Sequence, residues 1–332
     1  MTPEPRVQRP IVAVTRRLSG ELLASLEAMP WQLRLHDGLV PLGPELAVFL
    51  QGASAAILAP YDRVDEALLR QCPSLKVAAT LSAGHDNLDV AACARHGVAC
   101  TNAPDGVTAS TADFAMGLLV AAARRITKAD SLVRSGGWGA STYEDFMAPD
   151  ISGSTLGILG MGRIGQAVAR RAAHGFGMKV LYWSRSRLTA NREAELLCEC
   201  ADKQRVLQES HHLLVALPAS PDTRHLVGAR EFASMRKGAT FVHVGRGGVV
   251  DDAALAAALT SGHLAGAGLD VFEGEPRIRE ELLRVPGLVL TPHIASATPS
   301  TRLATVIQVR DNVAAALEGR RPPNLLKLVP PA

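Results

Sequence analysis

The sequence predicts an α/β protein built from two doubly wound parallel-sheet domains. Short apolar runs alternate with segments of helical spacing in both halves of the 332-residue chain. Continuously apolar strands separated by helices are typical of parallel sheets that are covered on both faces. A glycine-rich turn, Gly160-Met161-Gly162-Arg163-Ile164-Gly165, follows the first strand of the second series. The length also suits two domains of ordinary size.

The first series of predicted elements occupies residues 11–101. Its strand-like runs are short and apolar, whereas its helical segments place apolar residues three or four positions apart. The predicted strands are 11–15, 55–59, 77–81 and 98–101, and the predicted helices are 21–29, 44–51, 64–71 and 87–96. These elements form the first parallel sheet and its covering helices.

A long helical pattern over 108–134 separates the two series, and the glycine-rich stretch 135–139 ends it. The second series contains predicted strands at 155–159, 180–183, 212–217, 240–244, 266–269 and 288–291. A last helical segment covers 300–317. We predict that the chain crosses between the domains near 102–105 and 296–300.

Composition and charge exclude several classes of function. A net charge of +3 and an aromatic fraction of 4% give no reason to expect nucleic-acid binding. The longest apolar stretch, 114–123, is too short to span a bilayer, and residues 1–10 do not form a signal peptide. The five cysteines include no CxxC pair, so we expect free thiols, no metal site and a reducing cytoplasm.

The glycine-rich turn predicts a dinucleotide site, because it follows a strand, opens a helical run and leads to another strand. Gly160 permits the tight turn, Gly162 lets the backbone approach a pyrophosphate, and Gly165 allows close contact between helix and strand. The helix N-terminus offers free N–H groups to the phosphates. The second half of the chain is therefore the predicted nucleotide-binding half.

The next strand ends in Ser184-Arg185-Ser186-Arg187. An NAD site carries an acid about 20 residues after the glycines, where it binds the ribose 2′-hydroxyl. Arg185 occupies that position, and no acid stands within the turn. Arg185 and Arg187 attract a 2′-phosphate, and Ser184 or Ser186 adds a donor. We therefore predict NADP(H) over NAD(H), the alternative being that both arginines only solvate the loop.

Three residues beyond later strands suit 2-oxo-acid reduction. Arg246 lies in a glycine-rich loop, and its planar guanidinium matches a carboxylate. His293 follows another strand and can carry a proton. A carboxylate is needed to orient the imidazole, and the residues alone leave Glu273 and Glu275 as candidates.

The chain resembles the D-2-hydroxyacid dehydrogenase family, and within it the glyoxylate/hydroxypyruvate reductases that also reduce 2-ketogluconate. The motifs that carry the resemblance are LSAGHDNLD (81–89), GILGMGRIG (157–165), HVGRGGVVDDAAL (243–255), GLDVFEGEP (268–276) and TPHIASAT (291–298). The resemblance implies a Rossmann cofactor domain at 104–298, inserted into a flavodoxin-like substrate domain at 1–103 and 299–332. It also implies a homodimer with 108–150 as the dimerisation arm.

The resemblance further implies the role of each site residue. It makes Arg246, Glu275 and His293 catalytic, which selects Glu275 over Glu273. It gives substrate contacts to Ala83, Gly84, Arg246 and Ser296. It adds Arg163, Ile164, Leu217, Pro218, Val244, Gly245 and Asp270 to the cofactor site. The implied reaction is NADPH-dependent reduction of glyoxylate, hydroxypyruvate or 2-ketogluconate to a D-2-hydroxy acid, with His293 as the general acid.

The chain departs from its relatives at several positions. His211 and His212 stand where relatives often have an acid, and we predict that both are structural. His243 replaces a common asparagine beside the Arg246 loop. Trp138 matches the family, whereas 139–149 has its own sequence. In relatives this last segment can reach the active site of a neighbouring subunit.

Two alternatives remain at this point. A nucleotide-sensing corepressor on the same fold would tolerate loss of Arg246, Glu275 and His293, which are all present. A dehydrogenase of other specificity that uses NAD is the second alternative. A phosphoglycerate-type enzyme is disfavoured because no regulatory domain follows, and Arg185 disfavours formate or phosphite oxidation with NAD.

Overall fold

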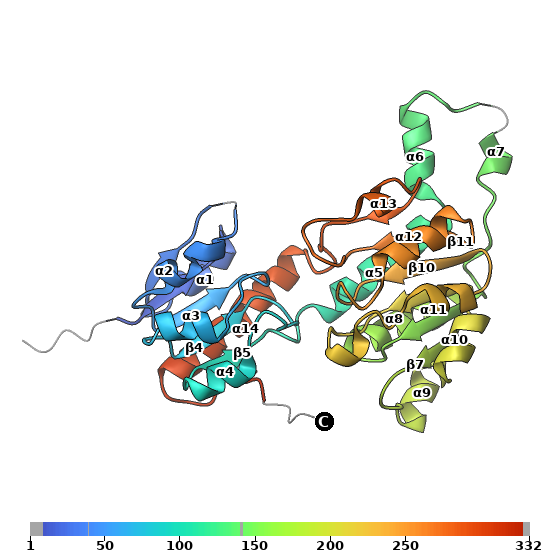
Figure 1. The fold of residues 1–332 in the computed structure, drawn as a ribbon. Coiled ribbons are helices and arrows are strands. Elements are labelled where there is room, and N and C mark those ends of the chain that lie inside the picture. Colours follow the sequence, from blue (N-terminus) through green and yellow to red (C-terminus); the bar gives the residue numbers. More distant parts are fainter. Residues whose placement is uncertain (1–8, 39, 140–141, 328–332) are drawn as a thin grey trace, which may run out of the picture. The chain divides into compact units, whose positions relative to one another are not determined.

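The structure is a computed structural model that describes residues 9–38, 40–139 and 142–327. It divides the chain into unit 1, Met1–Val107 with Thr298–Ala332, and unit 2, Thr108–Ala297. Each unit is a parallel sheet with helices on both faces (Figure 1), which confirms the predicted fold class. The ends of the predicted substrate domain, 1–8 and 328–332, lie outside the described residues, as do residues 140 and 141 of the predicted arm.

The sheet of unit 1 has the strand order β2-β1-β3-β4-β5, and all its pairs are parallel. This order is typical of flavodoxin-like folds. The strands are β1 (Ile11–Val14), β2 (Gln32–Leu35), β3 (Ala55–Leu58), β4 (Val77–Thr80) and β5 (Ala99–Thr101). The central strands β3 and β4 are buried along their whole length, as expected when both faces are covered.

Two hydrophobic cores lie on opposite faces of this sheet. The helices of unit 1 are α1 (Glu21–Glu27), η1 (Gly43–Glu45), α2 (Leu46–Leu50), α3 (Glu66–Gln71), α4 (Val90–Arg95) and α14 (Pro299–Leu317). Side chains of α2, α3 and α4 form the core on one face, and side chains of α1 and α14 form the core on the other. The C-terminal helix α14 therefore completes the same unit that the N-terminal residues begin.

The sheet of unit 2 has the strand order β12-β11-β10-β9-β6-β7-β8, again with parallel pairs throughout. The strands are β6 (Thr155–Leu159), β7 (Lys179–Trp183), β8 (Cys198–Cys200), β9 (His212–Val215), β10 (Ala239–His243), β11 (Leu264–Leu269) and β12 (Val289–Leu290). From β6 the chain moves to β7 on one side and later to β9 on the other. The direction of winding therefore reverses between β6 and β9.

Helices cover both faces of the second sheet. They are α5 (Thr108–Ala123), α6 (Ile126–Arg134), α7 (Thr142–Asp145), α8 (Arg163–Phe176), α9 (Ala190–Leu196), α10 (Lys203–Glu209), η2 (Pro221–Thr223), α11 (Ala229–Ser234), α12 (Asp252–Thr260) and α13 (Glu280–Leu283). Buried side chains of α5 and α8 form the core on one face, and those of α10 to α13 form the core on the other. None of the described helices has both the length and the apolar character needed to cross a membrane.

The structure corrects the prediction of one continuous helix over 108–134. The chain forms two helices, α5 and α6, and Arg125 between them has a left-handed φ of 53°. A residue in this conformation ends one helix and redirects the chain. Two further corrections concern strands, because β2 and β8 were not predicted and β12 is shorter than 288–291.

Candidate active site

The functional side chains predicted in unit 2 follow neighbouring strands at one edge of the sheet. All strands of this sheet are parallel, so their carboxyl ends lie at the same edge. Arg246 follows β10, Asp270 and Glu275 follow β11, and His293 follows β12. The glycine-rich turn follows β6, beside the point where the winding reverses. Ligands of open α/β sheets bind at such a reversal point, beyond the carboxyl ends of the strands.

The glycine-rich turn is shaped by close backbone approaches. Gly160 has a φ of 103°, and a Cβ atom there would lie 2.7 Å from the carbonyl oxygen of Ala216. A Cβ atom on Gly165 would lie 2.2 Å from the carbonyl oxygen of Gly160. A residue with a side chain would therefore clash with the backbone at either position. The turn can therefore stay close to the sheet and start α8 at its carboxyl edge.

The same turn fits a pyrophosphate. Gly162 precedes the first residue of the 14-residue helix α8, and a Cβ atom on Gly162 would meet nothing within 4 Å. Arg163 and Ile164 form the first turn of α8, where backbone N–H groups have no acceptor inside the helix. Open space beside these donors is what a bound phosphate requires.

The turn after β7 holds two arginines in different environments. The Nε and Nη2 atoms of Arg187 each donate a hydrogen bond of 2.9 Å to the carboxylate of Glu193, on α9. Hydrogen bonds from Arg187 and from the Tyr182 hydroxyl lower the pKa of Glu193 to about 2. Arg185 is exposed and makes no ion pair or side-chain hydrogen bond in the part of the chain that the structure describes. Arg185 is thus the arginine of this turn whose guanidinium is not paired with a carboxylate among the described residues.

The other predicted cofactor residues line the same edge of the sheet. Leu217 follows β9, Val244 and Gly245 follow β10, and all three are buried, whereas Pro218 is exposed. Ser184 is half-buried and Ser186 is exposed in the turn after β7. The structure therefore gathers the predicted cofactor residues of β6, β7, β9 and β10 along one border.

Glu275 and His293 form a hydrogen-bonded pair. Nδ1 of His293 lies 2.8 Å from Oε2 of Glu275, and Oε1 of Glu275 accepts the Phe272 N–H at 2.8 Å. Burial by itself would raise the pKa of the Glu275 carboxyl, but the hydrogen bond from His293 and the nearby charges of His293 and Arg246 lower it. A carboxylate on Nδ1 leaves Nε2 of the imidazole as the atom that can exchange a proton with a ligand. The side chain of His293 is 43% exposed.

His293 also has an unusual backbone conformation. Its φ is 54°, in the left-handed region that non-glycine residues rarely adopt. The carboxylate of Asp270, which is 1% exposed, accepts the N–H groups of Ile294 and Ala295 at 2.8 Å and the Thr291 hydroxyl at 2.7 Å. Asp270 therefore holds the loop that carries His293.

Arg246 is half-buried in the loop after β10. Its Nη1 atom donates a hydrogen bond of 2.9 Å to the carbonyl oxygen of Gly245. Its charge acts on Glu275, so the guanidinium lies within electrostatic reach of the pair formed by Glu275 and His293. The structure thus brings a cation, a carboxylate and an imidazole to one edge of unit 2.

The predicted substrate residues Ala83 and Gly84 belong to unit 1 and follow β4. The carbonyl oxygen of Ala83 accepts Nδ2 of Asn102 at 2.6 Å, and that of Gly84 accepts the Ser82 hydroxyl at 2.5 Å. Within the described residues, neither the Ala83 nor the Gly84 N–H donates a hydrogen bond. Both N–H groups are therefore available to an anionic ligand. Ser296 is half-buried in the loop that follows His293 in unit 2.

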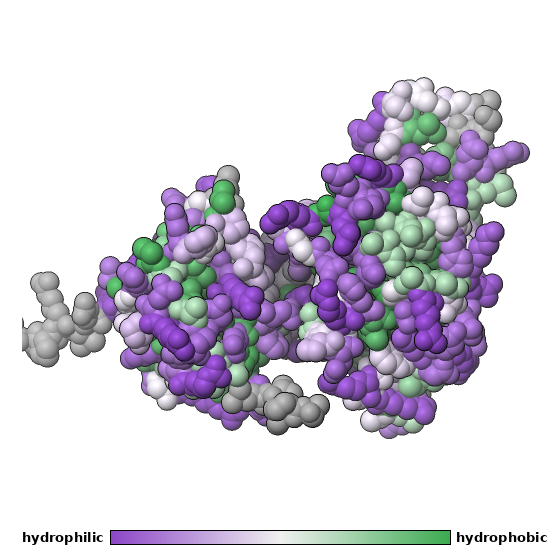
Figure 2. Space-filling model, viewed as in Figure 1, coloured by the Kyte–Doolittle hydropathy of each residue, from purple (hydrophilic) through white to green (hydrophobic). Residues whose placement is uncertain are grey.

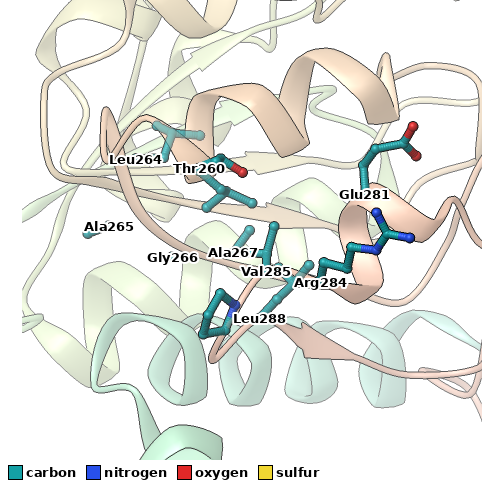
Figure 3. Close-up of a pocket in the computed structure, with 11 residues that line it drawn as sticks. Thr260, Leu264, Ala265, Gly266, Ala267, Glu281, Arg284, Val285 and Leu288 are labelled. Carbon is teal, nitrogen blue, oxygen red and sulfur yellow. The ribbon is translucent and has the colours of Figure 1, made fainter.

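A hollow of unit 2 lies away from this site. It is formed by the first residues of β11, the end of α12 and the segment around α13. Figure 2 shows apolar surface over α12, and Figure 3 shows Leu264, Ala267, Val285 and Leu288 in the hollow with Arg284 and Glu281 at its border. The hollow lies at the amino end of β11, whereas the polar residues described above follow carboxyl ends. We assign it no part in the chemistry.

The sequence analysis did not identify two residues that support these sites. Glu193 pairs with Arg187, and Asn102 fixes the peptide of Ala83. Neither belongs to a motif, and each reaches its partner only through folding. The sequence analysis correctly found no acid within the 184–187 turn, but α9 brings Glu193 to it from outside.

Comparisons with known proteins show the family of the chain. Residues 116–295 match the family model described as "D-isomer specific 2-hydroxyacid dehydrogenase, NAD binding domain". The chain is 39% identical to a glyoxylate reductase of Thermococcus litoralis over 325 residues, which cover 96% of this chain and 97% of the relative. It is 39% identical to glyoxylate/hydroxypyruvate reductase B of Serratia proteamaculans over 313 residues, covering 94% and 95%.

A solved structure is similar over almost the whole chain. It is the NADPH-dependent glyoxylate/hydroxypyruvate reductase of Sinorhizobium meliloti in complex with NADP and malonate. The TM-score is 0.81 at 31% sequence identity, and the match covers 96% of this chain and 97% of the other.

Proposed function

The chain belongs to the D-isomer-specific 2-hydroxyacid dehydrogenases, oxidoreductases that use a nicotinamide cofactor, and we propose that it reduces small 2-oxo acids with NADPH. The proposed substrates are glyoxylate, hydroxypyruvate and 2-ketogluconate, and the proposed products are D-2-hydroxy acids. The observation that carries this proposal is the pair of Glu275 and His293 with Arg246 nearby, at the edge of the sheet that also bears the glycine-rich turn.

In the proposed mechanism Arg246 binds the substrate carboxylate and polarises the 2-oxo group. The guanidinium suits this role because its planar donors match a carboxylate in two-point contact. In unit 1, the unused N–H groups of Ala83 and Gly84 can donate to the same kind of anion. When bound, the reduced nicotinamide supplies the hydride that reaches C2 of the substrate.

His293 provides the proton in this mechanism. The imidazolium donates from Nε2 to the oxygen that gains negative charge at C2. Glu275 holds Nδ1 at 2.8 Å, which fixes the orientation of the ring and leaves Nε2 toward the substrate. Arg246 stabilises the same developing charge, and losing one such contact typically costs on the order of 10²-fold in rate.

Preference for NADPH follows from Arg185 in this proposal. Arg185 is exposed at the turn after β7, with Ser184 and Ser186 on either side of it in the sequence. Arg187 is already paired with Glu193. A charged hydrogen bond to the 2′-phosphate contributes about 1.5–3 kcal/mol, which corresponds to roughly ten- to a hundredfold in affinity.

We also propose a homodimer that works in a reducing cytoplasm. Ile126, Val133, Trp138 and Met147 of the predicted arm are large apolar residues that stay exposed in the single chain, and burial against a second copy would remove them from water. The five cysteines are free thiols. Light scattering that finds only a particle of about 35 kDa at micromolar concentration would contradict the homodimer.

The decisive experiment measures initial rates over a panel of 2-oxo acids with each cofactor. We expect oxidation of NADPH with glyoxylate or hydroxypyruvate, and a kcat/KM at least about tenfold lower with NADH. Chiral chromatography of the glycerate formed from hydroxypyruvate should find the D enantiomer. Failure of every 2-oxo acid with both cofactors would refute the proposed function. Equal rates with NADH would refute only the assignment of Arg185.

A further inference from the structure

His243, the last residue of β10, is buried beneath the loop that carries Arg246. Its side chain is only 1% exposed. Nε2 of the ring lies 3.0 Å from the carbonyl oxygen of Arg246, and Nδ1 lies 3.4 Å from the carbonyl oxygen of Val215. Both ring nitrogens therefore face backbone acceptors.

The ring can donate to only one of these acceptors. Burial lowers the pKa of His243 to about 4, so the imidazole is neutral at pH 7 and carries a single N–H. The Val215 oxygen already accepts the Val244 N–H at 3.1 Å within the sheet. The shorter distance to the Arg246 oxygen thus assigns the proton to Nε2.

Backbone atoms of neighbouring segments also pack closely against the Arg246 loop. A Cβ atom on Gly245 would lie 2.5 Å from the Leu217 oxygen and 3.3 Å from Cε1 of His243, and one on Gly247 would lie 1.7 Å from the Phe272 oxygen. The His243 ring is the one side chain among these nearest contacts. It therefore fills the space under the loop and also binds the peptide that follows Arg246.

We propose that His243 is a positioning residue for Arg246. Its Nε2–H donates to the Arg246 carbonyl oxygen and so fixes the backbone from which the guanidinium reaches the substrate carboxylate. This inference rests on the proposed function, because it gives His243 an effect on carboxylate binding through Arg246. A displacement of about 1 Å at such a position can cost 10²-fold in rate.

Two amide substitutions separate positioning from simple filling of space. Glutamine at 243 places its amide nitrogen about where Nε2 of histidine lies, whereas asparagine places it about where Nδ1 lies. We expect His243→Gln to keep kcat/KM for the 2-oxo acid within about threefold of the original protein. We expect His243→Asn and the apolar variant His243→Leu to lose roughly tenfold or more, mainly through a higher KM for the 2-oxo acid, because the donor to Arg246 is lost.

KM for NADPH should stay within about twofold in all three variants, since the cofactor contacts are not changed. Equal losses of kcat/KM for the 2-oxo acid in His243→Gln and His243→Asn would overturn the inference. Equal increases of KM for the 2-oxo acid and KM for NADPH would also overturn it. Melting temperatures measured alongside identify any variant that fails to fold.

A measurement that needs no turnover keeps the inference separate from the proposed function. ¹⁵N NMR of the histidine rings, assigned with His243→Gln, should find Nε2 of His243 protonated and Nδ1 unprotonated at pH 7. A proton on Nδ1 would overturn the inference even in an active enzyme. If Nε2 carries the proton but no 2-oxo acid is reduced, the proposed function fails while the contact with Arg246 stands.

Discussion

Replacing His212 by leucine is expected to stabilise the protein, and the gain is expected to grow as the pH falls below about 6.5. His212 begins β9 and is 3% exposed. In the sheet it pairs with Leu156 of β6 and Thr240 of β10. Neither of its ring nitrogens has a hydrogen-bond partner among the residues that the structure describes. A buried polar group without a partner costs about 1–3 kcal/mol.

The pH dependence follows from the same burial. Burial, and secondarily the charge of His211, lower the pKa of His212 from 6.5 to about 4. Below pH 6.5 the unfolded chain therefore binds more protons than the folded protein, and the free energy of unfolding falls as the pH falls. For these two pKa values, linkage removes about 2 kcal/mol of stability between pH 7.5 and pH 5. Leucine at 212 abolishes this loss.

Urea unfolding at pH 7.5 and pH 5, followed by circular dichroism, measures the effect. His243 is buried and its pKa is lowered in the same direction, so only the difference between the original protein and His212→Leu isolates His212. If the free energy of unfolding falls equally between pH 7.5 and pH 5 in His212→Leu and in the original protein, the role given to His212 is refuted.

Two further predictions concern catalysis and cofactor selection. His293→Asn removes the imidazole but keeps a residue that tolerates a left-handed φ, so we expect kcat to fall by about 10²-fold or more while NADPH affinity measured by fluorescence stays the same. Retained turnover would exclude His293 as the proton donor. Arg185→Ala should raise KM for NADPH about tenfold or more without changing KM for NADH. Arg187→Ala should raise KM for NADPH less, because Glu193 already binds Arg187. Equal increases of KM for NADPH in the two variants would contradict the distinction between Arg185 and Arg187.

The sequence predicted the fold class because the central strands are mainly apolar runs without alternation. Strands such as β3, β4 and β9 are buried throughout. Their polar residues, Thr80 and His212, stand singly at a strand end and give no alternation that could suggest one solvated face. Two of the edge strands, β2 and β8, were missed for the opposite reason. Strand β2 alternates polar and apolar residues over only four positions, all partly exposed, and β8 has three residues. Neither therefore forms the continuous apolar run by which the other strands were predicted.

The break between α5 and α6 has no signal in the sequence either. Residues 120–130 contain no glycine or proline, and Arg124 and Arg125 are good helix formers. The left-handed conformation of Arg125 is a result of tertiary structure. Local propensity could not predict it, because the same residues would continue the helix in isolation.

The candidate site also contains two kinds of residue: reactive residues that belong to motifs, and buried residues that support the loops of those motifs. Arg246 and His293 could be proposed because each follows a strand, and parallel strands bring such positions to one edge. Glu275 was selected over Glu273 only by the resemblance to the family. The buried groups that fix their loops are His243 on the Arg246 carbonyl and Asp270 on the N–H groups of Ile294 and Ala295. In the sequence a buried histidine or aspartate beside a strand end is equally compatible with a capping role. Only the hydrogen bonds distinguish these groups, since they show that both bind the backbone of the loops that present the reactive side chains. Replacing His243 should therefore change catalysis more than cofactor affinity.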